Sequence, residues 1–122
     1  MSPLDSNNND NTIKKYDLQF HFSGFLNPSF ETRYESILVN GYQLVTNIEA
    51  LTFICYHNEI GYFERMYTST HRWTVGNIVS HIFRLLDEFT EYHNLESTFI
   101  DQSLEGFDFD MTKNEIEISL GS

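Results

Sequence analysis

Carboxylate side chains crowd the last third of this chain, and they are the residues best able to do chemistry. Residues 87–117 hold ten acidic residues against one lysine, and so carry nine of the eleven net negative charges. Carboxylates can transfer protons, bind metal ions or pair with the cationic groups of a partner. A field of this sign attracts cations and repels nucleic acid and anionic lipid. We therefore expect neither a nucleic-acid nor a membrane partner.

The spacing of these carboxylates gives little support to a metal site. Asp108-x-Asp110-x-Thr112 begins like a calcium loop, but Lys113 replaces the glycine of position six and Ser119 replaces the glutamate of position twelve. The histidines do not form the His-x-x-x-His spacing that places two zinc ligands on one helix face. We predict no metal ion and no cofactor.

His57 and Glu59 are the best candidates for catalysis, with His71 as a further working group. An imidazole beside a carboxylate can act as an acid–base pair, but neighbouring polar residues at a predicted turn often give this pattern by chance. Cys55 lies in the apolar run 51–56, where a small buried core residue is expected rather than a nucleophile. A single cysteine suits a reducing cytoplasm, which is the predicted location.

A long amphipathic helix is expected to position the first carboxylates. Apolar residues recur at three- and four-residue steps over residues 75–92, and Thr74 is a suitable N-cap. Asp87, Glu88 and Glu91 then fall late in the helix, near the negative end of its dipole. This placement is locally unfavourable, and a cationic partner would offset it.

A final hairpin is expected to position the other carboxylates. Apolar residues alternate with acidic ones over residues 107–111 and 115–120, so one face should be buried. The other face would present Asp108, Asp110, Glu115 and Glu117 to solvent. Like charges that face each other across strands destabilise a sheet by up to about 1 kcal/mol. Folding gains nothing from this arrangement, whereas binding could.

The rest of the chain favours strands. Residues 16–22 alternate as a half-buried strand, and residues 62–67 form a further strand. Asn40-Gly41 predicts a hairpin between residues 35–39 and 42–46. Residues 52–56 resemble a buried strand, although a helix over residues 48–57 is the alternative.

These elements predict one α+β domain at residues 13–122, preceded by a flexible polar tail at residues 1–12. Its fold would be an antiparallel sheet of about six strands packed against one long helix. Trp73, just before that helix, is interpreted as a packing residue rather than as a recognition anchor.

The leading functional hypothesis is an acidic protein-binding module that neutralises a basic partner. Small acidic immunity proteins against bacterial toxins such as nucleases work on this principle, and the comparison rests on size and charge. The predicted contact residues are Asp87, Glu88, Glu91, Tyr92, Glu105, Asp108, Asp110, Glu115 and Glu117. The hypothesis expects the helix end and the hairpin to join in one surface. If they lie on opposite sides of the molecule, the acidity of this region is expected to serve solubility instead.

Two alternatives remain open. A small α+β enzyme or ligand-binding domain would use His57 and Glu59 in a concave pocket. A structural or oligomerising domain would use its acidity only for solubility. The oligomeric state is not predicted.

Overall fold

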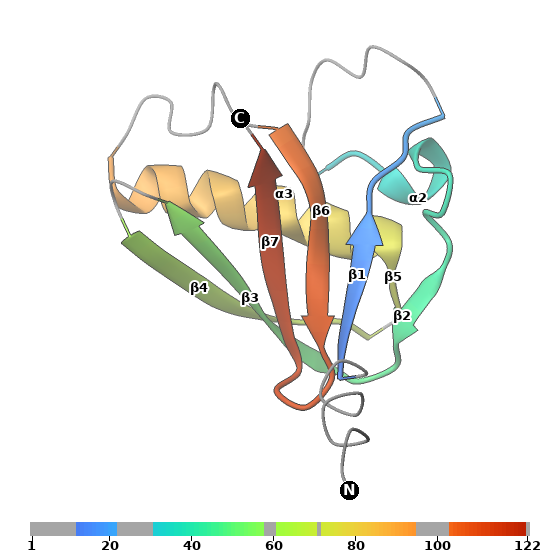
Figure 1. Ribbon diagram of the computed structural model, residues 1–122. Helices are drawn as coiled ribbons and strands as arrows, with labels where there is room; N and C mark the ends of the chain where they lie inside the picture. Colours follow the sequence, from blue (N-terminus) through green and yellow to red (C-terminus); the bar gives the residue numbers. More distant parts are fainter. Residues whose placement is uncertain (1–11, 22–30, 58–60, 71, 95–102, 122) are drawn as a thin grey trace, which may run out of the picture.

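A five-stranded sheet with a long helix on one side organises the chain (Figure 1). The structure is a computed structural model that describes residues 12–21, 31–57, 61–70, 72–94 and 103–121. Across the sheet the strand order is β1-β6-β7-β3-β4, and a separate two-stranded sheet pairs β2 with β5. The five strands of the large sheet are β1 Ile13–Asp17, β3 Ala50–His57, β4 Gly61–Thr68, β6 Ser103–Asp110 and β7 Glu115–Gly121. The remaining elements are α2 Tyr34–Ile37, β2 Leu44–Thr46, β5 Trp73–Thr74 and α3 Val75–Tyr92.

The predicted α+β class is confirmed, with one long helix packed against a multistranded sheet. The predicted final hairpin is also present, because β6 and β7 pair antiparallel. This hairpin lies inside the sheet, between β1 and β3. The pair β3–β7 is parallel, so the sheet is mixed rather than purely antiparallel.

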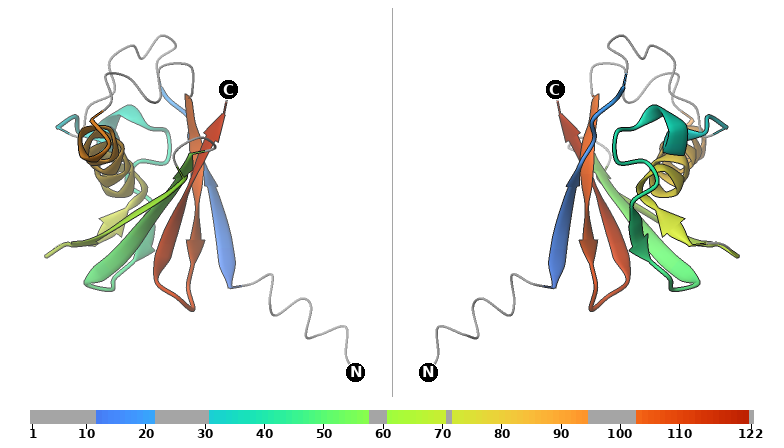
Figure 2. Two further views of the ribbon diagram at one scale, coloured as in Figure 1. Left: turned by 90° about the vertical axis from the view of Figure 1, so that its left-hand side faces the viewer. Right: turned by 90° about the vertical axis from the view of Figure 1, so that its right-hand side faces the viewer.

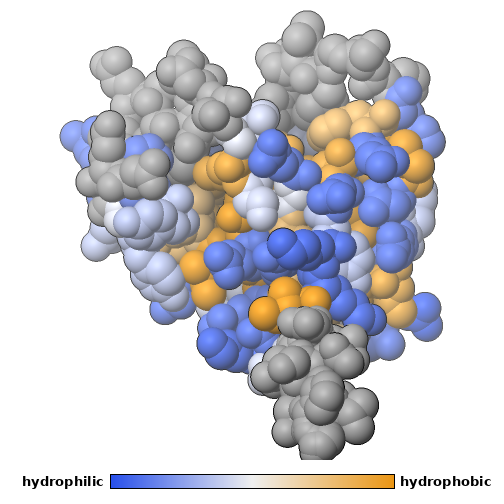
Figure 3. Space-filling model, viewed as in Figure 1, coloured by the Kyte–Doolittle hydropathy of each residue, from blue (hydrophilic) through white to orange (hydrophobic). Residues whose placement is uncertain are grey.

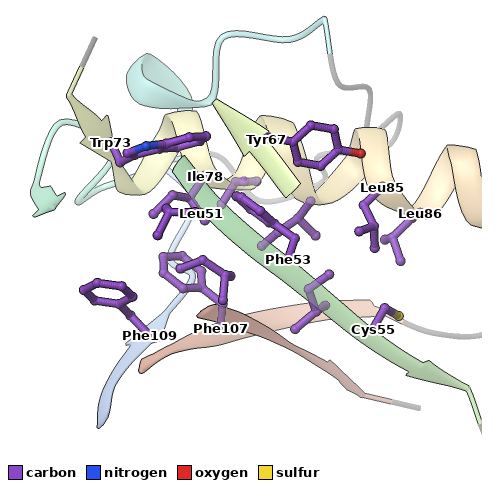
Figure 4. Close-up of a cluster of buried hydrophobic side chains, with 14 of the residues drawn as sticks. Leu51, Phe53, Cys55, Tyr67, Trp73, Ile78, Leu85, Leu86, Phe107 and Phe109 are labelled. Carbon is purple, nitrogen blue, oxygen red and sulfur yellow. The ribbon is translucent and has the colours of Figure 1, made fainter. Parts of the chain in front are cut away.

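The core lies between the sheet and α3 (Figure 4). Alternate residues of a strand point to opposite faces, so β3 sends Leu51, Phe53 and Cys55 to the helix side, where all three are buried. Trp73 is also fully buried, with its ring centre 5.7 Å from that of Phe53. Trp73 is therefore a packing residue and not a surface anchor.

The long helix forms as its periodicity predicts. The Thr74 Oγ1 accepts a hydrogen bond from the backbone N–H of Asn77 at 3.2 Å, which caps the first turn. The buried stripe runs from Val75 to Phe89. Tyr92, which continues the stripe in the sequence, is instead 70% exposed.

The hairpin predicted at Asn40-Gly41 is wrong. The short helix α2 occupies most of residues 35–39, and β2 pairs with β5 instead. Asn40-Gly41 does form a turn, in which the Gly41 N–H donates to the Leu38 carbonyl at 3.1 Å. A β-carbon at Gly41 would lie 2.1 Å from the Glu35 carbonyl oxygen. Close packing, rather than a hairpin turn, explains this glycine.

The remaining predictions are met in part. Residues 50–57 form a strand, so the helical alternative is wrong. The first strand ends at Asp17, yet Leu18 and Phe20 still pack against the core with Tyr16. Within the described residues there are seven strands, five of them in the large sheet. Phe22 and the predicted tail, apart from Thr12, lie outside the described residues.

Candidate functional site

One side of the large sheet is covered by α3, and no described helix or strand covers the other side (Figure 2). We call this second side the open face. Strand alternation assigns to it the residues that do not point into the core. These are Ile13, Lys15, Asp17, Ala50, Thr52, Ile54, Tyr56, Tyr62, Glu64, Met66, Thr68, Asp108, Asp110, Glu115, Glu117 and Ser119.

The hairpin carboxylates lie on the open face in facing pairs. Asp108 is opposite Glu117, and Asp110 is opposite Glu115. Lys15 of β1 is opposite Asp108 of β6, and it is the only basic residue among the described residues of the open face. With Asp17 and Glu64 the open face holds six carboxylates and one lysine, a net charge of −5. Figure 3 views this side and shows a hydrophilic band interrupted by hydrophobic patches.

Asp110 has a second, local role at the hairpin turn. Its Oδ1 accepts hydrogen bonds from the Thr112 hydroxyl at 2.7 Å, the Thr112 N–H at 3.0 Å and the Lys113 N–H at 3.3 Å. These hydrogen bonds, that of the hydroxyl first, hold the pKa of Asp110 below its usual value. Asp110 therefore helps to form the turn, so Asp108, Glu115 and Glu117 are better probes of binding.

Exposed aromatic and apolar side chains extend the open face beyond the predicted residues. Tyr56 is opposite Tyr62 across β3 and β4, and the two side chains are 65% and 57% exposed. The Tyr62 hydroxyl donates to Glu64 Oε2 at 2.6 Å, and this hydrogen bond raises the pKa of Tyr62 to about 12. Met66, on the same strand, is 66% exposed. The alternation of residues 61–68 carries this signal, which the sequence reasoning missed.

Glu88 belongs to a different cluster, on the helix side of the sheet. Its Oε1 accepts a hydrogen bond from the Tyr67 hydroxyl at 2.5 Å and lies 3.4 Å from Arg84 Nε, while its Oε2 lies 3.5 Å from Arg65 Nε. The Arg65 guanidinium is 4.3 Å from the ring centre of Phe63, and that of Arg84 is 5.2 Å from the ring centre of Tyr67. We call these five residues the helix-side cluster. The two arginines offset the unfavourable helix-end charge of Glu88.

The other predicted helix residues also lie on this side. Asp87 and Glu91 are exposed on α3, and the Tyr92 ring centre is 5.7 Å from that of Phe63. The sheet therefore separates the helix carboxylates from those of the hairpin. The predicted residues do not form one acidic surface, because α3 packs on the face opposite to the hairpin carboxylates.

Glu105 stands apart from both groups. It is exposed and lies where the β6–β7 register shifts, between Leu104 and Gly106. A β-carbon at Gly121 would lie 2.5 Å from the Glu105 carboxyl group, so this carboxylate packs against the end of β7. It does not continue the row of hairpin carboxylates.

Of the residues considered for catalysis, the structure describes His57 and Cys55. His57 is on the helix side of β3, with its ring centre 6.4 Å from that of Phe89, whereas Glu59 and His71 lie outside the described residues. Cys55 is buried, and burial raises the pKa of its thiol to about 11. A thiol with a raised pKa is a weak nucleophile at neutral pH, which supports its interpretation as a core residue.

A hollow of about 330 Å³ lies between α2 and α3. Its lining includes Arg33, His81 and Arg84, but not His57. The His81 Nδ1 lies 2.8 Å from the Asn77 carbonyl oxygen, and its ring packs edge-on against Trp73 at 4.8 Å. Burial lowers the pKa of His81. The side chain is part of the packing around Trp73.

Within the described ranges, no group of three histidine, cysteine or acidic side chains is placed to hold a metal ion. In the same ranges, neither helix has both the length and the apolar character needed to cross a bilayer. Comparison of the chain with protein-family models, with curated proteins and with solved structures finds no match.

Proposed function

We propose that this protein is a stoichiometric binding module whose open face covers a cationic surface of a protein partner. The observation that carries the proposal is the set of six carboxylates, with one lysine, on a sheet face that no described element covers. Neither ion pair found among the described residues involves these carboxylates, because both go to Glu88. The open face is therefore strongly acidic and has little internal compensation.

The energetics favour binding over folding as the purpose of this face. Each facing pair, such as Asp108 with Glu117, destabilises the free sheet by up to about 1 kcal/mol. A cation placed between the two carboxylates replaces this repulsion with two attractions. Charge complementarity also accelerates association and excludes partners of the wrong sign. The exposed Tyr56, Tyr62 and Met66 supply the apolar contact area that charge alone does not give.

A bacterial toxin such as a nuclease is the partner class that we propose. A nuclease must hold phosphates in a basic groove, so a rigid surface of carboxylates can occupy that groove and exclude nucleic acid. This class is inferred from size and charge, and it places the protein in the bacterial cytoplasm with its toxin. A basic protein of another class would use the same face.

The test compares two variants that remove the same charges from opposite sides of the sheet. Asp108→Asn/Glu117→Gln neutralises one facing pair on the open face, and Asp87→Asn/Glu91→Gln neutralises two exposed carboxylates of α3. A partner captured with the unaltered protein is purified, and its affinity for each variant is measured by titration calorimetry.

We expect a complex of equal stoichiometry with a basic protein. The open-face variant should lose about tenfold or more in affinity, and the helix variant less than about twofold, since close charge pairs across interfaces are worth more than about 1 kcal/mol. Affinity for the unaltered protein should fall as salt rises from about 50 to 300 mM. Equal losses for the two variants, or an affinity that salt does not change, would reject the proposal.

A further inference from the structure

The chain contains two clusters of carboxylates and aromatic rings, on opposite sides of the sheet, and only one of them holds arginine. We propose that the open face recognises arginine side chains of its partner, which stack on Tyr56 and Tyr62 and pair with Glu64 and Glu117. This inference rests on the proposed function and specifies the chemistry of the partner.

The helix-side cluster shows how this chain binds a guanidinium group. Arg65 lies over the ring of Phe63 at 4.3 Å while its Nε is 3.5 Å from the Glu88 carboxylate. Arg84 repeats the arrangement over Tyr67, at 5.2 Å from the ring centre and 3.4 Å from Glu88. Each arginine thus has an aromatic face below it and a carboxylate beside it.

The open face presents the same two kinds of group with no arginine. Tyr56 and Tyr62 face each other across β3 and β4. The neighbouring pair on the same face of the sheet is Ile54 with Glu64. Glu117 lies on the other side of Ile54, on β7. Glu64 and Glu117 therefore flank Ile54 two strand spacings apart, which is roughly 10 Å between backbones. We call these five residues the open-face cluster.

The one basic residue among the described residues of the open face lies far from the two tyrosines of this cluster. Lys15 is on β1, and β6 and β7 separate that strand from β3. Lys15 is therefore three strand spacings, roughly 14 Å, from Ile54 and two, roughly 10 Å, from Glu117. The direct neighbour of Lys15 across the strands is Asp108. The cation that would complete the open-face cluster must come from outside the described residues, and a basic partner supplies it.

Arginine suits this cluster better than lysine. Its planar guanidinium can stack on an aromatic ring and, in the same pose, donate hydrogen bonds sideways to carboxylates. The ammonium of lysine is compact and strongly hydrated, so it gains less from a ring face. The Tyr62 hydroxyl is already engaged with Glu64 at 2.6 Å, which holds the ring beside the carboxylate.

The test uses two short synthetic peptides of equal length and charge, one with arginine and one with lysine at every charged position. Each is titrated into the isotope-labelled full chain, and amide shifts are followed by NMR. We expect both peptides to shift amides of β3, β4 and β7, and the arginine peptide to bind about two- to fivefold more tightly, as one or two cation–π contacts predict.

Two tyrosine variants show where any preference arises. Tyr56→Leu/Tyr62→Leu keeps apolar area on the open face but removes both rings, so it should weaken the arginine peptide more than the lysine peptide and bring their affinities to within about twofold of each other. Tyr42→Leu removes a tyrosine that is 68% exposed elsewhere, and it should keep the preference. Well-dispersed spectra establish that each variant is folded.

The outcomes separate this inference from the proposed function. Equal affinities of the two peptides for the open face overturn arginine recognition and leave the acidic binding face standing. A preference that persists in Tyr56→Leu/Tyr62→Leu also overturns it. If neither peptide shifts the open face, both proposals fall together.

Discussion

The negative charge of Glu117 should destabilise the free protein but strengthen its binding to a cationic partner. It faces Asp108 across β6 and β7, and no described cation pairs with it. Glu117→Gln should therefore raise the free energy of unfolding by up to about 1 kcal/mol, because it removes a like-charge contact across strands. Urea denaturation measures this change. A clear loss of stability would mean that the carboxylate has a favourable contact in the free protein.

Glu88 should respond in the opposite direction. Its carboxylate accepts the Tyr67 hydroxyl and pairs with Arg65 and Arg84, although its side chain is 33% exposed and solvent weakens these contacts. We expect Glu88→Gln to lower the free energy of unfolding by about 1 kcal/mol. Glu91→Gln, three residues further along α3, is the matched control. It should change the free energy of unfolding by less than about 0.5 kcal/mol. Equal effects of the two substitutions would show that the helix-side cluster contributes nothing.

For individual residues, the local sequence pattern predicts which way some side chains point but not the contacts that depend on the tertiary fold. The outward direction of Asp108 and Glu117 follows from alternation alone, because Phe107 and Phe109 must be buried. The role of Glu88 could not be predicted in this way. Its hydroxyl donor, Tyr67, lies 21 positions earlier in the chain, and only the packing of α3 on β4 brings the two together.

The packing of α3 makes the stability of the protein depend on pH through His81. Burial lowers the pKa of this imidazole, so the unfolded chain binds its proton more readily than the folded protein does. The stability that neutral His81 contributes is therefore fully present above the pKa of a histidine in the unfolded chain, about 6.5, and it is lost as the pH drops below that value. Among the groups lining the same hollow, Arg84 adds to the lowering of this pKa.

Unfolding measured at about pH 7.5 and about pH 5.5 tests this dependence. The unaltered protein should lose stability between the two values, and His81→Phe, which keeps the aromatic contact with Trp73, should lose less. An equal loss in the variant would assign the effect to other groups.

Elements differ in how far their sequence determines them. The helix follows from its own periodicity and from the Thr74 cap, which are local signals. Asn40-Gly41 is misleading, because its turn chemistry favours a hairpin while Tyr34 and Leu38, at helical spacing, are both buried. Tertiary packing decides between the two. The parallel pairing of β3 with β7 has no local signal at all, since it joins distant residues such as Phe53 and Ile116.

The whole molecule should respond to salt in two opposite ways. With a net charge of −11, the free protein repels itself, so moderate salt should raise its midpoint of thermal unfolding. The same screening should weaken its complex with a cationic partner. Thermal unfolding and binding, measured over one series of sodium chloride concentrations, check both trends. A midpoint that falls with salt would show that favourable ion pairs outweigh the repulsion.

The charge of the molecule could be predicted from composition, but its distribution could not. Sequence places carboxylates on a helix and on a hairpin, and both assignments hold. Which face of the sheet the helix covers depends on the strand order and on the path of the chain between elements. The division of the carboxylates between two sides, and the exposure of Tyr56 and Tyr62, follow only from that arrangement.

The position of the β6–β7 hairpin inside the sheet has a consequence for biosynthesis. A ribosome makes β1, β3 and β4 first, yet β1 has no place in the sheet until β6 and β7 lie between it and β3. Strands that are far apart in the sequence pair slowly, and their edges stay unpaired until they do. The β6–β7 hairpin, which is synthesised after these strands, both completes the sheet and carries four of the open-face carboxylates. The nascent chain therefore gains its acidic surface in the same step that completes its fold.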